Sequence, residues 1–183
     1  MDRQVALETV KANIKNQNLI KHMIATEAIM RALAKRLSED EDEWGLAGLL
    51  HDIDLDVVGD DMTLHGKVSA DMAREAGANE SIAHAILCHN EMLGEKRENN
   101  FDKALYCADP LTGLITAAAL VHPEKKLAYV EVKSVAKRFK EKCFAAGANR
   151  EQIASCSELE LELNEFIELG LKAMQGVADD LGL

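Results

Sequence analysis

Proline is rare in this chain. Only two prolines, Pro110 and Pro123, occur in 183 residues, so long segments are free of the residue that most strongly interrupts a helix. Aromatic residues, which favour strands, are also few, with one Trp, two Tyr and four Phe, whereas the abundant Ala, Leu, Glu and Lys favour helices or suit strands poorly. No segment shows the alternation of apolar and polar residues that is typical of a half-buried strand. We therefore expect an all-α protein.

Length and charge narrow the class of protein further. A chain of this length favours a single domain and buries about 70% of its unfolded surface, so it needs neither a disulfide nor a metal ion merely to fold. Its 21 basic and 32 acidic residues give a net charge of −11. That charge argues against a nucleic-acid partner and against an anionic membrane surface, because both require clustered cations.

The cysteines and the beginning of the chain indicate a compartment. The four cysteines form no Cys-x-x-Cys pair, so neither a zinc knuckle nor a thioredoxin-type site is indicated. The first residues lack the apolar core of a signal peptide. The longest stretch without Asp, Glu, Lys or Arg, residues 110–123, is too short to span a bilayer. We predict a reduced protein of the cytoplasm with no membrane partner.

Capping residues, glycines and apolar spacing divide the chain into expected helices. Asp2 and Asn18 are the expected caps of the first two, either Asn79 or Ser81 is expected to start the fifth, and Pro110 is expected to break the longest one. The expected helices cover approximately residues 3–16, 19–37, 39–52, 65–76, 80–91, 102–121, 130–143, 149–156 and 164–181. We expect the chemistry in residues 18–116, with residues 124–183 either completing the core or forming the face of a homodimer.

Ionisable residues on apolar helix faces are the most specific feature of the sequence. Helical spacing places His22, His51 and His89 on apolar faces, and it places His84 on the face opposite His89, where we expect it to be exposed and without a role. His65 stands at a helix start, and a carboxylate, Asp109, projects from a largely apolar segment. Because such groups are costly to bury unpaired, and a metal ion would satisfy several at once, the pattern indicates a metal site.

The chemistry of these side chains narrows the choice of metal. A mixed set of imidazoles and carboxylates suits Fe, Mn, Zn or Ni, and the lack of sulfur ligands argues against a purely structural zinc site. With Asp52, which directly follows His51, the candidate ligands number six. That is more than one catalytic ion normally takes, which indicates a pair of divalent ions.

The order of these residues resembles the HD superfamily of metal-dependent phosphohydrolases. The His51-Asp52 pair closes a segment that begins at Gly48, and the segment from Leu105 to Asp109 resembles the family's closing Ala-Asp motif. The resemblance implies an HD-type helical bundle with additional C-terminal helices, forming one domain over residues 1–183. It also implies that one ion is held by four residues, which are His22, His51, Asp52 and Asp109. By the same resemblance, His65 and His89 hold a second ion, with Asp52 bridging the two.

The resemblance also implies a reaction. It is the hydrolysis of a small phosphoester or phosphoanhydride, such as a nucleotide or a dinucleoside polyphosphate, by a water that the metal pair activates, with Asp52 as a catalytic residue. The six-ligand pattern is similar to the branch that splits diadenosine tetraphosphate symmetrically. Relatives that act on cyclic dinucleotides carry a His-His-Glu motif and a Gly-Tyr-Pro motif. This chain departs from them, because it reads His89-Asn90-Glu91 and has no Gly-Tyr-Pro motif. The alternative is a non-catalytic HD-type module for metal binding or signalling.

Three residues near the motif, Asp54, Asp56 and Lys67, have two possible interpretations each. Asp54 takes the place of the glycine that many relatives have in a His-Asp-Ile-Gly sequence. Asp54 and Asp56 are either acids or hydrogen-bond acceptors beside a ligand histidine, or aspartates on the loop surface. Lys67 is either a phosphate-binding cation or a solvated lysine.

Overall fold

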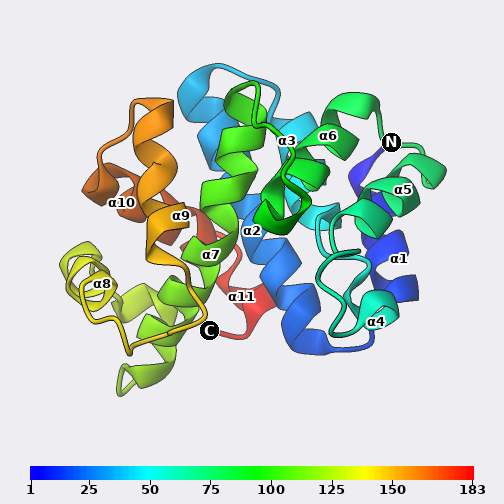
Figure 1. Cartoon of the computed structure of the whole chain (residues 1–183). Helices are drawn as coiled ribbons and strands as arrows, with labels where there is room; N and C mark the ends of the chain where they lie inside the picture. The colour runs from blue at the N-terminus through cyan, green and yellow to red at the C-terminus, as the bar shows by residue number, and fades with distance from the viewer.

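The computed structural model describes all residues from 1 to 183 as helices joined by turns, without a strand (Figure 1). The prediction of an all-α fold is therefore confirmed. The first half contains α1 (Arg3–Asn13), α2 (Gln17–Leu37), α3 (Glu41–Leu50), α4 (Leu55–Val58), α5 (Lys67–Glu75), α6 (Glu80–His89) and the short 3₁₀ helix η1 (Glu91–Leu93). The second half contains α7 (Asn100–Val121), η2 (Leu127–Tyr129), α8 (Val132–Phe139), α9 (Arg150–Ala154), η3 (Ser155–Leu159), α10 (Leu163–Gln175) and α11 (Ala178–Leu181).

Side-chain caps set most of the helix starts. Asp2 accepts a hydrogen bond from the backbone N–H of Val5, so the cap expected there is confirmed. Asn79 accepts one from that of Ile82, so Asn79 rather than Ser81 caps α6. The expected cap at Asn18 is wrong, because Asn16 takes that position and accepts the N–H of Asn18. The helix therefore begins one residue before Asn18, and the Asn18 side chain is free to make other contacts.

Pro110 does not break α7, contrary to the sequence prediction. The helix runs from Asn100 through the proline to Val121, although proline cannot donate the hydrogen bond that the carbonyl of residue i−4 normally accepts. That carbonyl belongs to Tyr106, and it accepts a hydrogen bond of 3.4 Å from the side-chain amide of Gln152 in α9. A neighbouring helix thus supplies the donor that the proline removes.

Two long helices, α2 and α7, form the centre of the bundle, and Figure 1 shows the other helices arranged around them. α3 packs closely on α2 because Gly48 has no side chain. A Cβ atom at Gly48 would lie 2.9 Å from the backbone of Thr26 and Glu27, which is closer than such atoms approach. The C-terminal end of α3, where His51 stands, is therefore held tightly against α2.

The last third of the chain is divided more finely than the sequence predicted. The single helix expected over residues 164–181 is two helices, α10 and α11, separated at Gly176 and Val177. The helix expected over residues 130–143 covers only Val132–Phe139. These helices join the same hydrophobic core as the first half, and α10 approaches α7 through Gly170, where a Cβ atom would lie 2.6 Å from Leu111.

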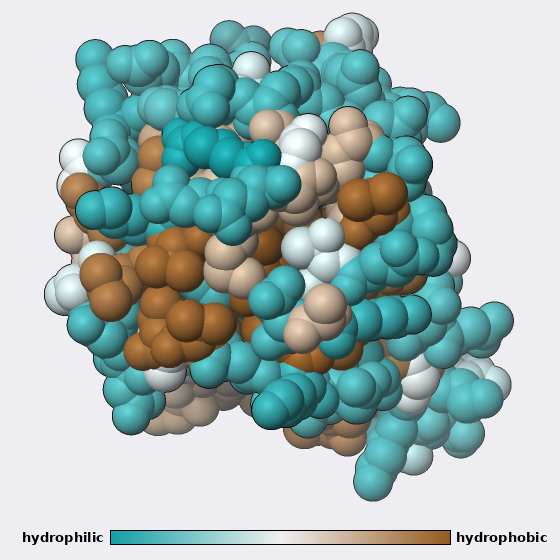
Figure 2. All heavy atoms as spheres, turned by 90° about the vertical axis from the view of Figure 1, so that its right-hand side faces the viewer, coloured by the Kyte–Doolittle hydropathy of each residue, from teal (hydrophilic) through white to brown (hydrophobic).

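By length and composition alone, α7 is long and apolar enough to cross a membrane, but most of it is buried inside the bundle. Figure 2 shows the side of the molecule on which α1, α4 and α5 lie, where polar side chains surround a gathering of apolar ones. Val57 in α4, and Met62 and Leu64 after it, are among the large apolar side chains exposed to solvent.

Candidate metal centre

Four histidines on four different segments direct the same ring nitrogen, Nε2, toward one point. The Nε2 atoms of His22 and His51 lie 3.2 Å apart, and those of His65 and His89 lie 3.0 Å apart. His22 comes from α2, His51 from the end of α3, His65 from the turn before α5 and His89 from the end of α6. The structure therefore brings together the four histidines that the sequence analysis named as candidate ligands.

Asp52 lies at the middle of this group. Its Oδ1 atom is 3.3 Å from His51 Nε2, 3.4 Å from His65 Nε2 and 3.5 Å from His89 Nε2. Its Oδ2 atom is 3.3 Å from the Nε2 atom of His22. One buried carboxylate therefore touches all four imidazoles.

Asp109 completes the group from α7. Its Oδ1 atom lies 3.1 Å from His22 Nε2 and 3.8 Å from His51 Nε2. Asp109 and His22 are the most exposed members, with 26% and 23% of their side chains accessible, whereas the other four have 9% or less. The centre is therefore open to solvent on the side where α2 and α7 meet.

The opposite ring nitrogen, Nδ1, has a hydrogen-bond acceptor in every case. The acceptors are Thr112 Oγ1 for His22, the Gly48 carbonyl for His51, Asp54 Oδ1 for His65 and the Ile86 carbonyl for His89. The Thr112 hydroxyl donates its own hydrogen to the Asp109 carbonyl, so its oxygen accepts from the histidine. We assign the N–H to Nδ1 in all four neutral rings, which leaves the Nε2 lone pairs directed at the centre.

This donor set fits a metal centre. Four inward lone pairs and two carboxylates have no hydrogen to share among themselves, and a histidine that binds a metal typically donates its other N–H to an acceptor of the kind seen here. Two overlapping groups bring their donor atoms within 4.8 Å of one another, namely His22, His51 and Asp109, and His51, Asp52 and His89. Donor atoms this close to one another would hold divalent cations.

Without a cation, protons balance the charge of the carboxylates. Burial disfavours the charged form of the His22 ring, but hydrogen bonds and charges from Asp109 and Asp52 outweigh it and raise the pKa of His22 to about 9. The pKa of His51 is also raised well above its ordinary value, against burial, by the charge of Asp52 and hydrogen bonds to Asp109 and Asp52. Burial would raise the pKa of Asp52, but the charge of His51 and hydrogen bonds from His22, His51 and His89 hold it well below its ordinary value. The pocket thus favours cations, whether they are protons or metal ions.

The structure places Asp54, Asp56 and Lys67, the three residues with two interpretations each, in different surroundings. Asp54 is fully buried, and it accepts hydrogen bonds from His65, Gly66 and Ser69, so it acts as an acceptor beside a ligand candidate. Asp56 is exposed and accepts the N–H of Lys15. Lys67 is exposed at the start of α5.

His84 was expected to be exposed, but it is partly buried and pairs with a buried carboxylate. Its Nδ1 atom lies 3.1 Å from Asp102 Oδ1, and the Sγ atom of Cys88 packs 3.7 Å from the same nitrogen. The other oxygen of Asp102 accepts the N–H of Glu98. The helical period correctly placed His84 away from His89, but it does not show that the connection to α7 covers that face.

The comparisons with known proteins agree with this geometry. The HD domain family matches residues 19–120, a range that contains all six residues of the centre. The chain is 33% identical over 98 residues to Ribonuclease Y of Oleidesulfovibrio alaskensis, covering 54% of the chain and 18% of that relative. It is 31% identical over 140 residues to Ribonuclease Y of Lawsonia intracellularis, covering 74% of the chain and 26% of the relative.

A longer but weaker match extends over most of the chain. Ribonuclease Y of Sulfurovum sp. is 25% identical over 167 residues, which are 89% of the chain and 32% of that relative. The chain thus spans about a third or less of the length of these curated relatives. Their names support the HD superfamily and give no support to the diadenosine tetraphosphate branch. The chain belongs to the HD domain family, whose members bind divalent metals and are typically metal-dependent hydrolases.

Proposed function

We propose that this protein is a metal-dependent phosphohydrolase that cleaves a small phosphoester or phosphoanhydride at a centre of two divalent ions. His22, His51, Asp52 and Asp109 would hold one ion, and His65 and His89, together with Asp52, would hold the other. Fe, Mn, Zn or Ni suits this mixture of imidazole and carboxylate donors. Bound divalent ions supply Lewis acidity, which lowers the pKa of water and neutralises charge on phosphoryl oxygens.

The contact of Asp52 with all four imidazoles is the observation that carries this proposal. A carboxylate that serves only to balance charge needs one cationic partner, whereas this one has both oxygens within 3.5 Å of Nε2 atoms from four segments. Such an arrangement is suited to a carboxylate shared by two ions. The Nδ1 contacts described above fix each ring, so the centre is held in place before a substrate arrives.

The substrate class follows from access and charge. His22 and Asp109 form the open side of the centre, so a phosphate would enter there. Two divalent ions add four positive charges to two carboxylates, which makes the centre attractive for an anion even within a chain of net charge −11. A small substrate is favoured because the chain's acidic surface opposes a long phosphate backbone.

Cleavage of RNA is the second candidate, because the relatives above carry the name ribonuclease. In that case the activity would also be hydrolysis of a phosphoester at the same centre. The two candidates differ in how strongly turnover depends on salt. RNA binding weakens steeply as salt is added, whereas the binding of a small anion at a buried centre changes less.

The experiment compares the full chain with Asp52→Asn and, as a matched control, with Asp56→Asn four residues further on. Purification without chelator, followed by metal analysis, gives the ions per chain. Turnover is then measured with Mn²⁺ on p-nitrophenyl phosphate, diadenosine tetraphosphate, AMP and a short single-stranded RNA.

We expect the wild type to turn over at least one substrate. Asp52→Asn should lose roughly 100-fold or more of this activity, since general acid–base and metal-site contributions are of that size. Asp56→Asn should change it little. Equal turnover by Asp52→Asn would contradict the proposal. Bound metal without any turnover would favour the non-catalytic module.

A further inference from the structure

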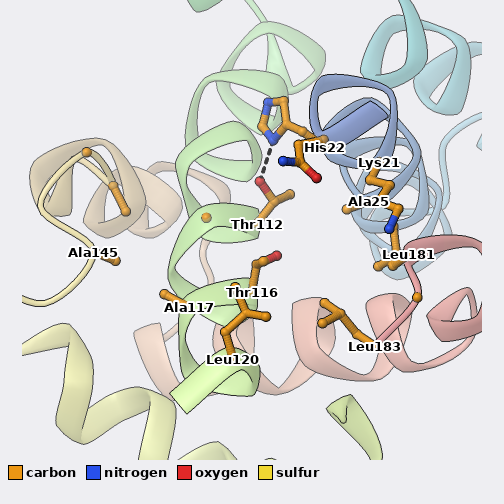
Figure 3. Close-up of a pocket in the computed structure, with 15 residues that line it drawn as sticks. Lys21, His22, Ala25, Thr112, Thr116, Ala117, Leu120, Ala145, Leu181 and Leu183 are labelled. Atoms are coloured by element: carbon orange, nitrogen blue, oxygen red, sulfur yellow. Dashed lines mark hydrogen bonds between the residues drawn. The ribbon is translucent and has the colours of Figure 1, made fainter. Parts of the chain in front are cut away.

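A cavity of about 630 Å³ lies between α2, α7 and the last residues of the chain (Figure 3). Its volume falls within the range typical of small-molecule sites. On the α2 side it is lined by Asn18, Lys21 and His22, and on the α7 side by Thr112 and Thr116. His22 and Thr112 also belong to the metal centre, where they are hydrogen-bonded to each other at 2.8 Å. The cavity therefore lies directly beside the metal centre and shares His22 with it.

The cavity lies along the open side of the centre. Asp109, one of the two exposed members, precedes Thr112, Gly113 and Thr116 by three, four and seven residues, so these residues share one face of α7. Leu120 lies further along the same face. With a rise of 1.5 Å per residue, Leu120 is about 16 Å along the helix from Asp109. A molecule held at the centre by its phosphate would extend along this face into the cavity.

The lining changes from polar to apolar with distance from the centre. The Thr112 hydroxyl is hydrogen-bonded to His22, Thr116 follows one helical turn further along, and Figure 3 shows Leu120 and Leu183 at the end opposite His22. No Phe, Tyr or Trp side chain lines the cavity. A matching ligand carries polar atoms next to its phosphate and a less polar part beyond, and it is recognised by hydrogen bonds and aliphatic contacts rather than by ring stacking.

Lys21 is the cation of this cavity. Its ammonium group lies against Gly182, where a Cβ atom would be 3.0 Å away. It takes part in none of the ion pairs of the structure, so its charge is available to a ligand. The opposite wall is held by Arg150, whose guanidinium donates to the carbonyls of Phe139 and Ala145 at 3.0 Å each. The cavity is thus a formed site rather than a gap between loose segments.

We propose that this cavity binds the organic part of a small phosphorylated substrate, of about the size of a nucleoside, while Lys21 pairs with a second anionic group of that substrate. The inference rests on the proposed function, because it places the scissile phosphate at the metal centre. It assigns Lys21 and Thr116 to substrate binding and makes the cavity the determinant of specificity.

Gly113 offers a way to fill the cavity without disturbing the centre. It is exposed in the cavity wall, and the nearest atom to a Cβ added there is Ala148 Cβ at 4.0 Å. Gly113→Leu therefore projects a side chain into the cavity, and Gly113→Ala adds a single methyl group that fits. Lys21→Met removes the cavity's charge and keeps a side chain of similar length.

The test uses two probes that resist hydrolysis and differ only in the nucleoside. α,β-Methylene-ADP and methylenediphosphonate are titrated by calorimetry into the full chain loaded with Mn²⁺, together with inorganic phosphate as a single-anion probe. We expect the nucleoside to strengthen binding at least tenfold in the wild type and in Gly113→Ala. Gly113→Leu should abolish this gain while binding methylenediphosphonate normally. Lys21→Met should weaken binding of the two-anion probes about tenfold and leave inorganic phosphate unchanged. Metal content and thermal midpoint verify that each variant is folded and loaded.

The outcomes separate this inference from the proposed function. Equal binding of α,β-methylene-ADP and methylenediphosphonate to the wild type, or no binding of either, would overturn the cavity proposal. An equal loss of both in Gly113→Leu would also overturn it. Nucleoside-dependent binding that Gly113→Leu removes supports the cavity even if none of the substrates is turned over, in which case only the hydrolase proposal fails.

Discussion

The carboxylate of Asp54 holds the ring of His65 through a hydrogen bond of 2.8 Å between Oδ1 and Nδ1. Its other oxygen accepts the backbone N–H groups of Gly66 at 2.8 Å and Ser69 at 3.0 Å. Gly66 has a φ of +85°, in the region that favours glycine, and a Cβ there would lie 3.3 Å from the His89 ring. One buried aspartate therefore fixes both the orientation of His65 and the turn that carries it.

Replacing Asp54 should weaken metal binding. Asp54→Ala removes the acceptor from His65 Nδ1 and leaves two buried N–H groups without a partner, so we expect a loss of metal affinity of roughly 10- to 100-fold. The affinity is measured by competition with a chromophoric chelator. Asp56→Ala makes the same change on the exposed helix α4 and should leave the affinity unchanged. Unaltered affinity in Asp54→Ala would show that His65 needs no support.

Metal affinity and the stability of the metal-free protein should change with pH in opposite directions. Burial disfavours charge on His22, but Asp109 and Asp52 outweigh it and raise its pKa to about 9 in the absence of metal. The stability from this raised pKa is full below about pH 6.5 and is lost as the pH rises through about 9. A metal must displace the proton below pH 9, so its affinity should rise about tenfold per pH unit for each proton displaced. Thermal midpoints with and without chelator at pH 6.5 and 9 check both trends, and parallel trends would contradict them.

The buried thiols should resist modification and should make the protein sensitive to alkali. All four cysteines are free, and only Cys143 is exposed. Burial is the main cause that raises the pKa of Cys156 to about 11 and of Cys88 to about 12. Since the unfolded chain ionises these thiols first, their contribution to stability is full below about pH 9 and is lost as the pH rises through about 11 for Cys156 and about 12 for Cys88.

Thiol titration provides the measurement. At pH 8 we expect one fast equivalent with a disulfide reagent in the folded protein and four after denaturation. Cys143→Ser should remove the fast equivalent. Rapid reaction of a second thiol in the folded protein would show that a buried cysteine is accessible.

Much of the centre could be predicted because three of its four histidines, His22, His51 and His89, occupy apolar helix faces whose period the sequence displays. His22 and His89 follow the helical spacing of their neighbours, and the His51-Asp52 pair follows an apolar run. The order of these residues then led to the HD superfamily, which the family match confirms.

What the sequence left open depends on contacts between distant segments. Asp54 and Asp56 look alike in the loop, and only the folded chain places Asp54 beside His65 and Asp56 beside Lys15. Gln152, 46 residues from Tyr106, supplies the donor that lets α7 continue through Pro110. The lining of the cavity combines α2, α7 and the chain's last residues, which no local pattern brings together.

The close packing of α3 on α2 at Gly48 gives a further prediction about the centre. Gly48→Ala places a methyl group 2.9 Å from the backbone of Thr26 and Glu27, which forces the two helices apart. We expect a loss of about 1–3 kcal/mol from overpacking, and a thermal midpoint lowered by roughly 2–4 °C for each kcal/mol. Because the Gly48 carbonyl accepts the Nδ1–H of His51, and because His22 is on the other helix, metal affinity should fall as well.

Gly113→Ala is the matched control, since it adds the same methyl group inside α7, where the nearest atom is 4.0 Å away. It should stabilise the protein by up to about 1 kcal/mol, as alanine favours the helix over glycine, and it should leave metal affinity unchanged. Thermal unfolding and chelator competition on both variants separate the two effects. If Gly48→Ala loses stability but binds metal as the wild type does, then His22 and His51 tolerate a change in helix spacing, and the centre is less dependent on the α2–α3 contact than its geometry indicates.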